Sequence, residues 1–256
     1  MLDLRHPFFD DREISLVFQP VICPDRWVAD DALAEILTRV KRGTNGSTED
    51  ECPSEFFKRL NAEPEIAIAY DRWVLLKVFK NIPRDKHYLI NLGDATLLDP
   101  GLIDYLAQFD MSFHMEISER HEGIYGEAAI AQIKALSRKH HLYLNDFGQE
   151  GANLVNLALL APYLRGVKID AQLVINILHD PYNRVIVYGI LRLLNDLKMS
   201  LGDLSLSVIA EGVETQAILD ELLGLRAIAA PGLTLCCQGW LYGQPELLYP
   251  PEMPFA

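Results

Sequence analysis

The chain has 256 residues, half of them hydrophobic, with 23 basic and 36 acidic residues and a net charge of −13. This length supports one large domain or two small ones, with enough apolar residues for a substantial core. The acidic balance disfavours a duplex nucleic acid or an anionic membrane surface as partner, so a nucleotide partner is expected to be small and locally bound.

Features that mark secreted or membrane proteins are not evident in the sequence. The N-terminus lacks a continuous apolar run, and the uncharged stretch 227–245 contains Pro231 and several glycines, so neither indicates membrane insertion. The four cysteines show no Cys-x-x-Cys spacing, and Cys236 and Cys237 are adjacent, which indicates neither a disulfide framework nor a zinc site. We therefore expect a soluble protein of the reducing cytoplasm.

Short apolar segments alternate with helical patterns from about residue 15 onward, which is typical of a mostly parallel α/β architecture. Eight strands are predicted, and this number indicates a closed TIM-type (β/α)8 barrel, with residues 1–256 forming a single domain. The predicted strands are 15–22, 34–40, 87–92, 113–118, 142–146, 166–170, 205–211 and 233–238.

Two of the connecting segments have apolar residues at three- and four-residue spacing, which predicts amphipathic helices. These residues are Ala129, Ile133 and Leu136 in the first segment, and Ile186, Ile190, Leu193, Leu194 and Leu197 in the second. The segment 41–53 is rich in Gly, Ser, Thr and Asn and is predicted to be a surface loop.

Every predicted strand carries a polar side chain at or near one end. Singly, each is also expected of a turn or a solvated strand end. Because side chains alternate along a strand, Glu35 shares a face with Leu37 and Arg39. Taken together, the polar residues predict one cluster at the C-terminal face of a barrel. The set is Gln19, Glu35, Asn91, Glu116, Asn145, Lys168, Glu211 and Gln238.

The chemistry of this set favours a hard divalent cation. Carboxylate and amide oxygens suit Mg²⁺ or Mn²⁺ rather than zinc held by thiolates. Two such ions could activate water and stabilise a phosphodiester displacement. Lys168 could orient that water or neutralise developing charge, and Arg39 could hold a phosphate oxygen. A structural lysine paired with a carboxylate is an equally good reading of Lys168 from spacing alone.

Several motifs, taken in chain order, carry a resemblance to a known family. They are Phe18-Gln-Pro20, Glu35-Ile-Leu-Thr-Arg39, Ile90-Asn-Leu92, Glu116-Ile-Ser-Glu119, Asn145-Asp-Phe-Gly148, Lys168-Ile-Asp170, Ala210-Glu-Gly-Val-Glu-Thr215 and Gln238-Gly-Trp-Leu-Tyr-Gly243. Together they resemble the motifs of the EAL family, bacterial phosphodiesterases that linearise cyclic di-GMP on a TIM barrel. The resemblance covers nearly the whole chain.

The resemblance implies a role for each matching position. The implied metal ligands are Glu35, Asn91, Glu116, Asn145 and Asp146, with Lys168 as catalytic lysine and Glu211 in the same metal and water site. The residues implied to face the nucleotide are Gln19, Leu37, Arg39 and Gln238. Glu119 is implied to anchor the loop after its strand, and Glu214 to support the site from nearby.

Two departures from the family pattern affect the functional prediction. The family has a metal-bridging aspartate where this chain has Asn145, so the second metal should be the one weakened. The family's Asp-Phe-Gly-Thr-Gly-Tyr-Ser-Ser loop is replaced by Asp146-Phe-Gly-Gln-Glu-Gly-Ala-Asn153, which puts metal coupling and dimer contacts in question. We predict a cyclic di-GMP receptor with weak or no turnover; the alternatives are an active phosphodiesterase and a scaffold for a protein partner.

Overall fold

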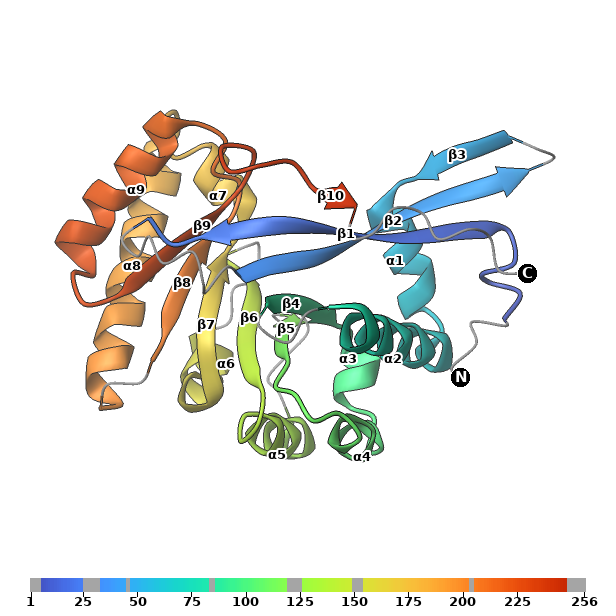
Figure 1. Ribbon diagram of the computed structural model, residues 1–256. Coiled ribbons are helices and arrows are strands. Elements are labelled where there is room, and N and C mark those ends of the chain that lie inside the picture. The colour runs from blue at the N-terminus through green and yellow to red at the C-terminus, as the bar shows by residue number, and fades with distance from the viewer. Residues whose placement is uncertain are drawn as a thin grey trace.

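The computed structural model describes residues 6–24, 33–44, 47–82, 86–118, 126–148, 154–202 and 205–247, and its strands form one continuous sheet (Figure 1). The strands are β1 (Arg12–Ile22), β2 (Leu33–Thr44), β3 (Ser47–Glu51), β4 (His87–Leu92), β5 (His114–Ser118), β6 (His141–Phe147), β7 (Leu164–Ile169), β8 (Ser207–Ala210), β9 (Thr234–Gln238) and β10 (Glu246–Leu247). Their order is β10-β1-β9-β8-β7-β6-β5-β4-β2-β3, and an additional β1–β2 pairing closes the barrel. The predicted TIM-type barrel and its eight strands are confirmed.

The barrel departs from a fully parallel one at β1. This strand is antiparallel to both of its barrel neighbours, β2 and β9, whereas the strands from β2 round to β9 pair in parallel. Residues 23–32 separate β1 from β2, which is fewer than the dozen or so that a parallel crossover needs. The regular βα repeat therefore begins at β2.

Helices cover the outside of the barrel (Figure 1). They are α1 (Pro53–Asn61), α2 (Pro64–Asn81), α3 (Asp94–Leu97), α4 (Leu102–Ala107), α5 (Glu127–Leu136), α6 (Leu154–Leu160), a 3-10 turn (Ala161–Tyr163), α7 (Ala171–Ile175), α8 (Pro181–Ser200) and α9 (Gln216–Ala229). The two predicted amphipathic helices are α5 and α8. Asp180 caps α8 by accepting the Tyr182 N–H, with Pro181 in the first turn. Across the described ranges, no helix is long and apolar enough to cross a membrane.

The segment 41–53, predicted to be a surface loop, is instead mostly an antiparallel hairpin. Strand β2 continues to Thr44, and β3 pairs antiparallel with it. Val40 lies opposite Glu51 at one end of this pairing, and Thr44 lies opposite Ser47 at the other. Helix α1 then starts at Pro53. The prediction was wrong because this strand pair extends beyond the barrel: its backbone groups are satisfied by the ladder, while its side chains need no apolar alternation.

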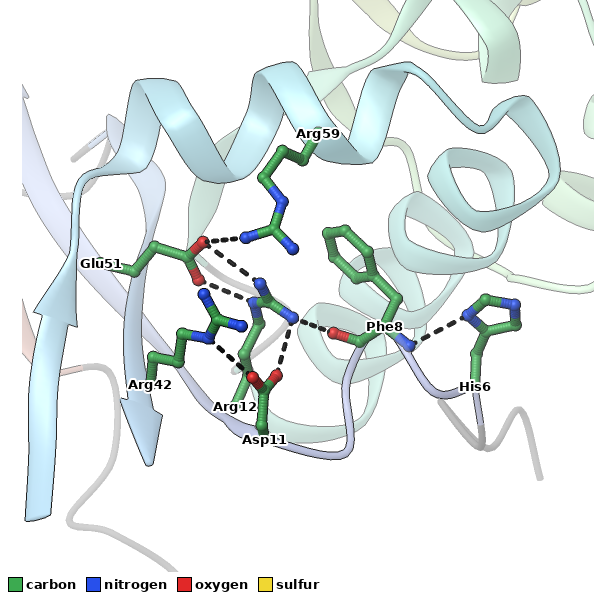
Figure 2. Close-up of polar contacts among 7 residues, drawn as sticks. All are labelled: His6, Phe8, Asp11, Arg12, Arg42, Glu51 and Arg59. Carbon is green, nitrogen blue, oxygen red and sulfur yellow. Dashed lines mark hydrogen bonds and ion pairs between the residues drawn. The ribbon is translucent and has the colours of Figure 1, made fainter. Parts of the chain in front are cut away.

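An ionic network ties this hairpin to the start of β1 and to α1. Figure 2 shows Arg12 at its centre, with Nε 2.7 Å from Glu51 Oε2 and Nη1 2.8 Å from Asp11 Oδ1. Arg59 of α1 also reaches Glu51, and Arg42 of β2 reaches Asp11. The Arg12 side chain is 2% exposed, whereas those of Arg42 and Arg59 are 47% and 45% exposed. Arg12 is therefore the buried member of the network.

The cysteine prediction needs a correction. Cys23, just beyond β1, and Cys236 of β9 form a disulfide across 213 residues, with their Cα atoms 4.0 Å apart. Sequence spacing gave no sign of it, because the two residues become neighbours only when β1 closes the barrel against β9. Both belong to a small apolar layer inside the barrel, formed by Val21, Leu89, Tyr143, Ile209 and Cys236 with Cys23 and Leu33 against it.

The buried guanidinium of Arg12 generates a stability prediction. Arg12→Ala should lower the free energy of unfolding by about 2–3 kcal/mol, because it removes charge-assisted hydrogen bonds from a largely buried Glu51. Arg42→Ala and Arg59→Ala serve as matched controls and should each cost about 1 kcal/mol or less, since both are half exposed. Urea denaturation of the three variants checks this. Equal losses for Arg12 and Arg42 would contradict the assignment of Arg12 as the anchor.

Candidate functional site

A cleft of about 770 Å³ opens at the end of the barrel where the parallel strands finish. Nine of the residues singled out from the sequence line it: Gln19, Glu35, Leu37, Asn91, Asn145, Asp146, Glu211, Glu214 and Gln238. Lys168 and Glu116 lie beneath, with 0% and 1% of their surface exposed. Strands β1, β2, β4, β5, β6, β7 and β9 thus contribute to one cluster, as the alternation of side chains requires.

Lys168 is the hub of this cluster. Its Nζ lies 2.9 Å from Glu35 Oε2, 2.8 Å from Glu116 Oε1 and 2.5 Å from Glu211 Oε1. A buried ammonium has a large desolvation cost, which three carboxylates at hydrogen-bond distance offset. Three acids and one base leave the cluster with excess negative charge unless protons or a cation bind.

The pKa shifts in the cluster indicate which of its carboxyl groups bind a proton most readily. Burial raises the pKa of Glu116 well above its usual range, and the neighbouring Glu35 carboxylate adds to the effect. Burial also raises the pKa of Glu211 to about 7. For Glu35, burial is outweighed by Lys168 and Gln238, which lower its pKa. Burial alone would lower the pKa of Lys168, but the three carboxylates raise it well above normal. Among the three carboxyl groups, burial and neighbouring charges therefore favour the protonated form most at Glu116 and least at Glu35.

Side-chain amides extend the cluster across the cleft. Gln238 Nε2 donates to Glu35 Oε2 at 2.7 Å and to Gln19 Oε1 at 3.1 Å. Asn91 Nδ2 donates to the other Glu35 oxygen at 2.8 Å. Asn145 Nδ2 in turn donates to Asn91 Oδ1 at 3.3 Å. Asn145 is therefore part of a relay of neutral amides that ends on Glu35.

The oxygen atoms of the cleft fit one hard cation. Within the described part of the chain, Glu116 Oε2 and Asn145 Oδ1 are buried and accept no hydrogen bond, and Glu35, Asn91 and Asp146 supply further oxygens nearby. No three His, Cys, Asp or Glu side chains of the described residues surround a common point. Lys168 Nζ lies among three of the carboxylates, and two of the implied ligands are amides.

Local backbone features place the cleft residues. Asp146 has a φ of 53°, a left-handed conformation that short polar side chains tolerate, and it coincides with a register shift between β6 and β7. Gly239 has a φ of 156°, and a Cβ there would lie 2.3 Å from Val213 O. Only glycine permits this approach, which sets the position of Gln238 and of Trp240 after it.

Two predicted residues are not placed in the cleft. Arg39 is exposed and lies further along β2, where its Nη1 donates to Thr38 O at 3.1 Å. It shares the strand face of Glu35 and Leu37 but is not among the residues lining the cleft. Glu119 lies outside the described residues, so its predicted role stays a prediction.

Sequence reasoning missed other residues of the cleft. Asp71 of α2 is buried and accepts the Gly93 N–H at 2.8 Å, and burial raises its pKa to about 6. It holds the turn that follows Asn91, and nothing in the local sequence marks it. Trp240 is 63% exposed at the cleft. It lies inside the Gln238–Gly243 motif, which was the available signal for it.

Comparison with known proteins identifies the family. The EAL domain model matches residues 2–245, so the chain belongs to the EAL domain family. Uncharacterised proteins of Mycobacterium tuberculosis and Mycobacterium bovis are 25% identical over 265 residues, covering 95% of this chain. The chain spans only 38% of the length of these relatives.

Solved structures share the fold. The EAL enzyme Bd1971, in a form bound to cAMP and cyclic di-GMP, has a TM-score of 0.73 at 21% identity over 93% of this chain and 64% of its own. The FimX EAL domain of Pseudomonas aeruginosa, bound to cyclic di-GMP, has a TM-score of 0.68 at 23% identity over 91% and 90% of the two chains. Klebsiella pneumoniae BlrP1, with manganese and cyclic di-GMP, has a TM-score of 0.65 at 23% identity over 91% and 56%.

The hub position of Lys168 generates a pH-dependent prediction. Lys168→Met leaves the buried carboxylates without a cation and should cost about 3–5 kcal/mol of unfolding free energy at about pH 8. The folded-state pKa values of the carboxyl groups then lie above their unfolded values. Their contribution is therefore present at low pH and lost as pH rises through the folded values. The variant should regain part of its stability at about pH 5.

Urea denaturation with a chelator present, at both pH values, measures this effect. Lys139→Met is the matched control, since Lys139 is exposed and its Nζ donates to the backbone carbonyl of Phe109. That variant should lose about 1 kcal/mol or less, equally at both pH values. A Lys168→Met protein whose deficit does not shrink on acidification would contradict the pairing described for the hub.

Proposed function

We propose that this EAL domain protein binds cyclic di-GMP as a regulator and turns it over weakly or not at all. The observation that carries the proposal is the position of Asn145. It stands where the family resemblance has a bridging aspartate, and it donates a hydrogen bond to Asn91. A neutral amide supplies one oxygen to one ion and no charge to a second.

Several side chains of the cleft support the proposed nucleotide binding. Gln19 and Gln238 line the cleft, and Gln238 Oε1 is a buried acceptor with no hydrogen bond among the described residues. Leu37 offers an apolar wall, and Trp240 an exposed aromatic ring. Arg39 lies beyond Leu37 on the same face of β2, outside the cleft, and would contact a phosphate oxygen that extends past Leu37. The cyclic di-GMP complexes of Bd1971 and FimX, which share this fold, support the choice of ligand.

A divalent ion, Mg²⁺ or Mn²⁺, is part of the proposal. Glu35, Asn91, Glu116, Asn145 and Asp146 would hold one ion, and a second would be weak or absent. The manganese and calcium complexes of BlrP1 support a divalent ion in this fold. When bound, the metal would neutralise the carboxylates and polarise a phosphodiester oxygen. Lys168 and Glu211 would act as the catalytic pair in any residual turnover, with Glu214 supporting the site and Glu119 its neighbouring loop.

Two other functions remain in view, each with its own observation. An active phosphodiesterase is favoured by the contact between Lys168 and Glu211, whose pKa of about 7 suits proton transfer. A scaffold for a protein partner or a homodimer is favoured by exposed apolar side chains on α6 and α8, among them Val155, Tyr182 and Val185. In each case we propose that residues 1–256 form one domain that acts in the cytoplasm.

The decisive experiment is a hydrolysis assay with Mg²⁺ and with Mn²⁺, run beside a direct titration of cyclic di-GMP. Binding with little product supports the proposed regulator. Brisk formation of the linear product would favour the active phosphodiesterase instead. If no binding is detected at high micromolar nucleotide, the scaffold for a protein partner is the function that remains.

Arg39 gives the first binding prediction. Arg39→Ala should weaken cyclic di-GMP binding by about 1.5–3 kcal/mol, the range for a hydrogen bond to a charged group. Arg42→Ala is the matched control, because Arg42 lies on the opposite face of β2 and is paired with Asp11. Isothermal titration of both variants checks this, and equal affinity of the Arg39 variant and the unmodified protein would remove Arg39 from the ligand site.

Asn145 gives the prediction for turnover. Asn145→Asp should restore the missing charge and the bridging oxygen, and so raise the hydrolysis rate at least tenfold for each ~1.4 kcal/mol of barrier recovered. Asn145→Ala, which lacks both oxygen and charge, is the control and should stay inactive. Product formation over time is the measurement. If Asn145→Asp binds the nucleotide but stays inert, the limitation lies in residues 149–153, outside the described part of the chain.

A further inference from the structure

The disulfide between Cys23 and Cys236 lies at the narrowest join of the barrel. Strands β1 and β9 pair in the described residues only through Val21–Gln238 and Ile22–Cys237. Every other neighbouring pair of barrel strands shares at least four such positions. The Cys23–Cys236 bond follows these two pairs directly, so it adds a covalent link where the backbone ladder contributes least.

The same join carries groups of the ligand cleft. Cys236 and Gln238 are two residues apart on β9 and share its inward face. Gln19 of β1 and Cys23, just beyond the end of β1, are four residues apart and lie on the corresponding face. Gln238 donates to Glu35 at 2.7 Å and to Gln19 at 3.1 Å. The position of Gln238 relative to Gln19 therefore depends on how firmly β9 is held against β1.

The remaining cysteines are placed differently. Cys237 faces the other side of β9, in the core between sheet and helices. Cys52 is exposed just before α1, where its Sγ contacts Ser54 Oγ at 3.2 Å. Neither lies in the apolar layer beneath the cleft, so the redox chemistry of this layer belongs to Cys23 and Cys236.

We propose that Cys23 and Cys236 form a reversible oxidation site that controls ligand binding through Gln238 and Gln19. The oxidised pair holds β9 against β1 with both glutamines in place, and the reduced pair loosens the join and weakens binding. The co-reactant is a low-molecular-weight thiol of the glutathione class. The effect on the ligand rests on the cyclic di-GMP binding proposed above, whereas the oxidation site itself does not.

The exchange is balanced over two steps. A glutathione thiolate attacks Sγ of Cys23, which is half buried at the end of β1, and forms a mixed disulfide. The Cys236 thiolate leaves and takes a proton. A second glutathione thiolate then attacks the glutathione sulfur of the mixed disulfide, releasing Cys23 as a thiol and oxidised glutathione. Two electrons pass from two glutathione molecules to the protein disulfide, and oxidation reverses both steps.

The experiment equilibrates the full chain in glutathione buffers from fully oxidised to fully reduced. Alkylation and mass measurement count the free thiols, hydrogen exchange follows residues 234–243, and titration gives the cyclic di-GMP affinity. Cys23→Ser and Cys236→Ser mimic the reduced state. If either variant fails to fold, the reduced unmodified protein provides the same measurement. Cys52→Ser is the control and should keep the full redox response.

The expected result is a change of two thiols per chain between buffers, faster exchange in 234–243 when reduced, and cyclic di-GMP affinity lowered by roughly fivefold or more. A pair that stays oxidised or stays reduced throughout overturns the oxidation site. Interconversion with unchanged exchange and unchanged affinity overturns the coupling to the cleft. If the pair interconverts and exchange is faster when reduced, but neither state binds the nucleotide, the oxidation site and its effect on the β1–β9 pairing are supported. In that case it is the proposed cyclic di-GMP binding that is contradicted.

Discussion

The contact of Lys168 with three carboxylates is the constraint on which the candidate site depends. Glu35, Glu116 and Glu211 come from β2, β5 and the end of β8, and without a central cation their mutual repulsion would oppose closing these strands into one barrel. The ammonium holds them together while leaving the cluster short of positive charge. Burial, together with the neighbouring carboxylates, raises the pKa of Glu116, and the excess of negative charge is of the kind that a divalent ion would neutralise.

The reversed strand β1 determines the shape of the site. Because β1 and β2 run antiparallel and continue beyond the barrel, they form a long ribbon whose inner face carries Gln19 and Leu37, with Arg39 beyond the cleft. The buried Arg12 network anchors the far end of this ribbon to α1. On its other side, β1 pairs with β9 at only two described positions, next to the Cys23–Cys236 bond, so the backbone ladder contributes less to the wall bearing Gln238 than to the wall bearing Glu35. Ligand affinity should therefore be sensitive to changes at that join.

Under the proposed function, the difference between a receptor and an enzyme rests on the charge at Asn145 and on the loop that follows it. Asn145 is close in size to aspartate and keeps one oxygen directed into the cluster, but it also brings a donor, which Asn91 accepts. The amide continues the hydrogen-bond relay through Asn91 to Glu35. It contributes no charge to a second ion.

The sequence by itself determined the barrel and most of the site. Alternation along short strands put Glu35, Asn91, Lys168 and Gln238 on inward faces, and parallel strands bring such residues to one rim, so their convergence followed from local periodicity. The motifs around Glu35 and Asn145 then indicated the family and its point of departure.

Other features were decided only by the tertiary structure. The direction of β1, the pairing of β3 on β2, the Cys23–Cys236 bond and the carboxylate of Asp71 beneath Gly93 all join segments distant in the chain or lacking an apolar pattern. Arg39 shares a strand face with Glu35 yet lies beyond the cleft. The alternation of side chains predicts which face of a strand a residue occupies, but not whether its position along the strand falls within the cleft. These outcomes depend on how the barrel closes. Closure is a balance of packing and hydrogen bonding over the whole sheet, which no short stretch of sequence encodes.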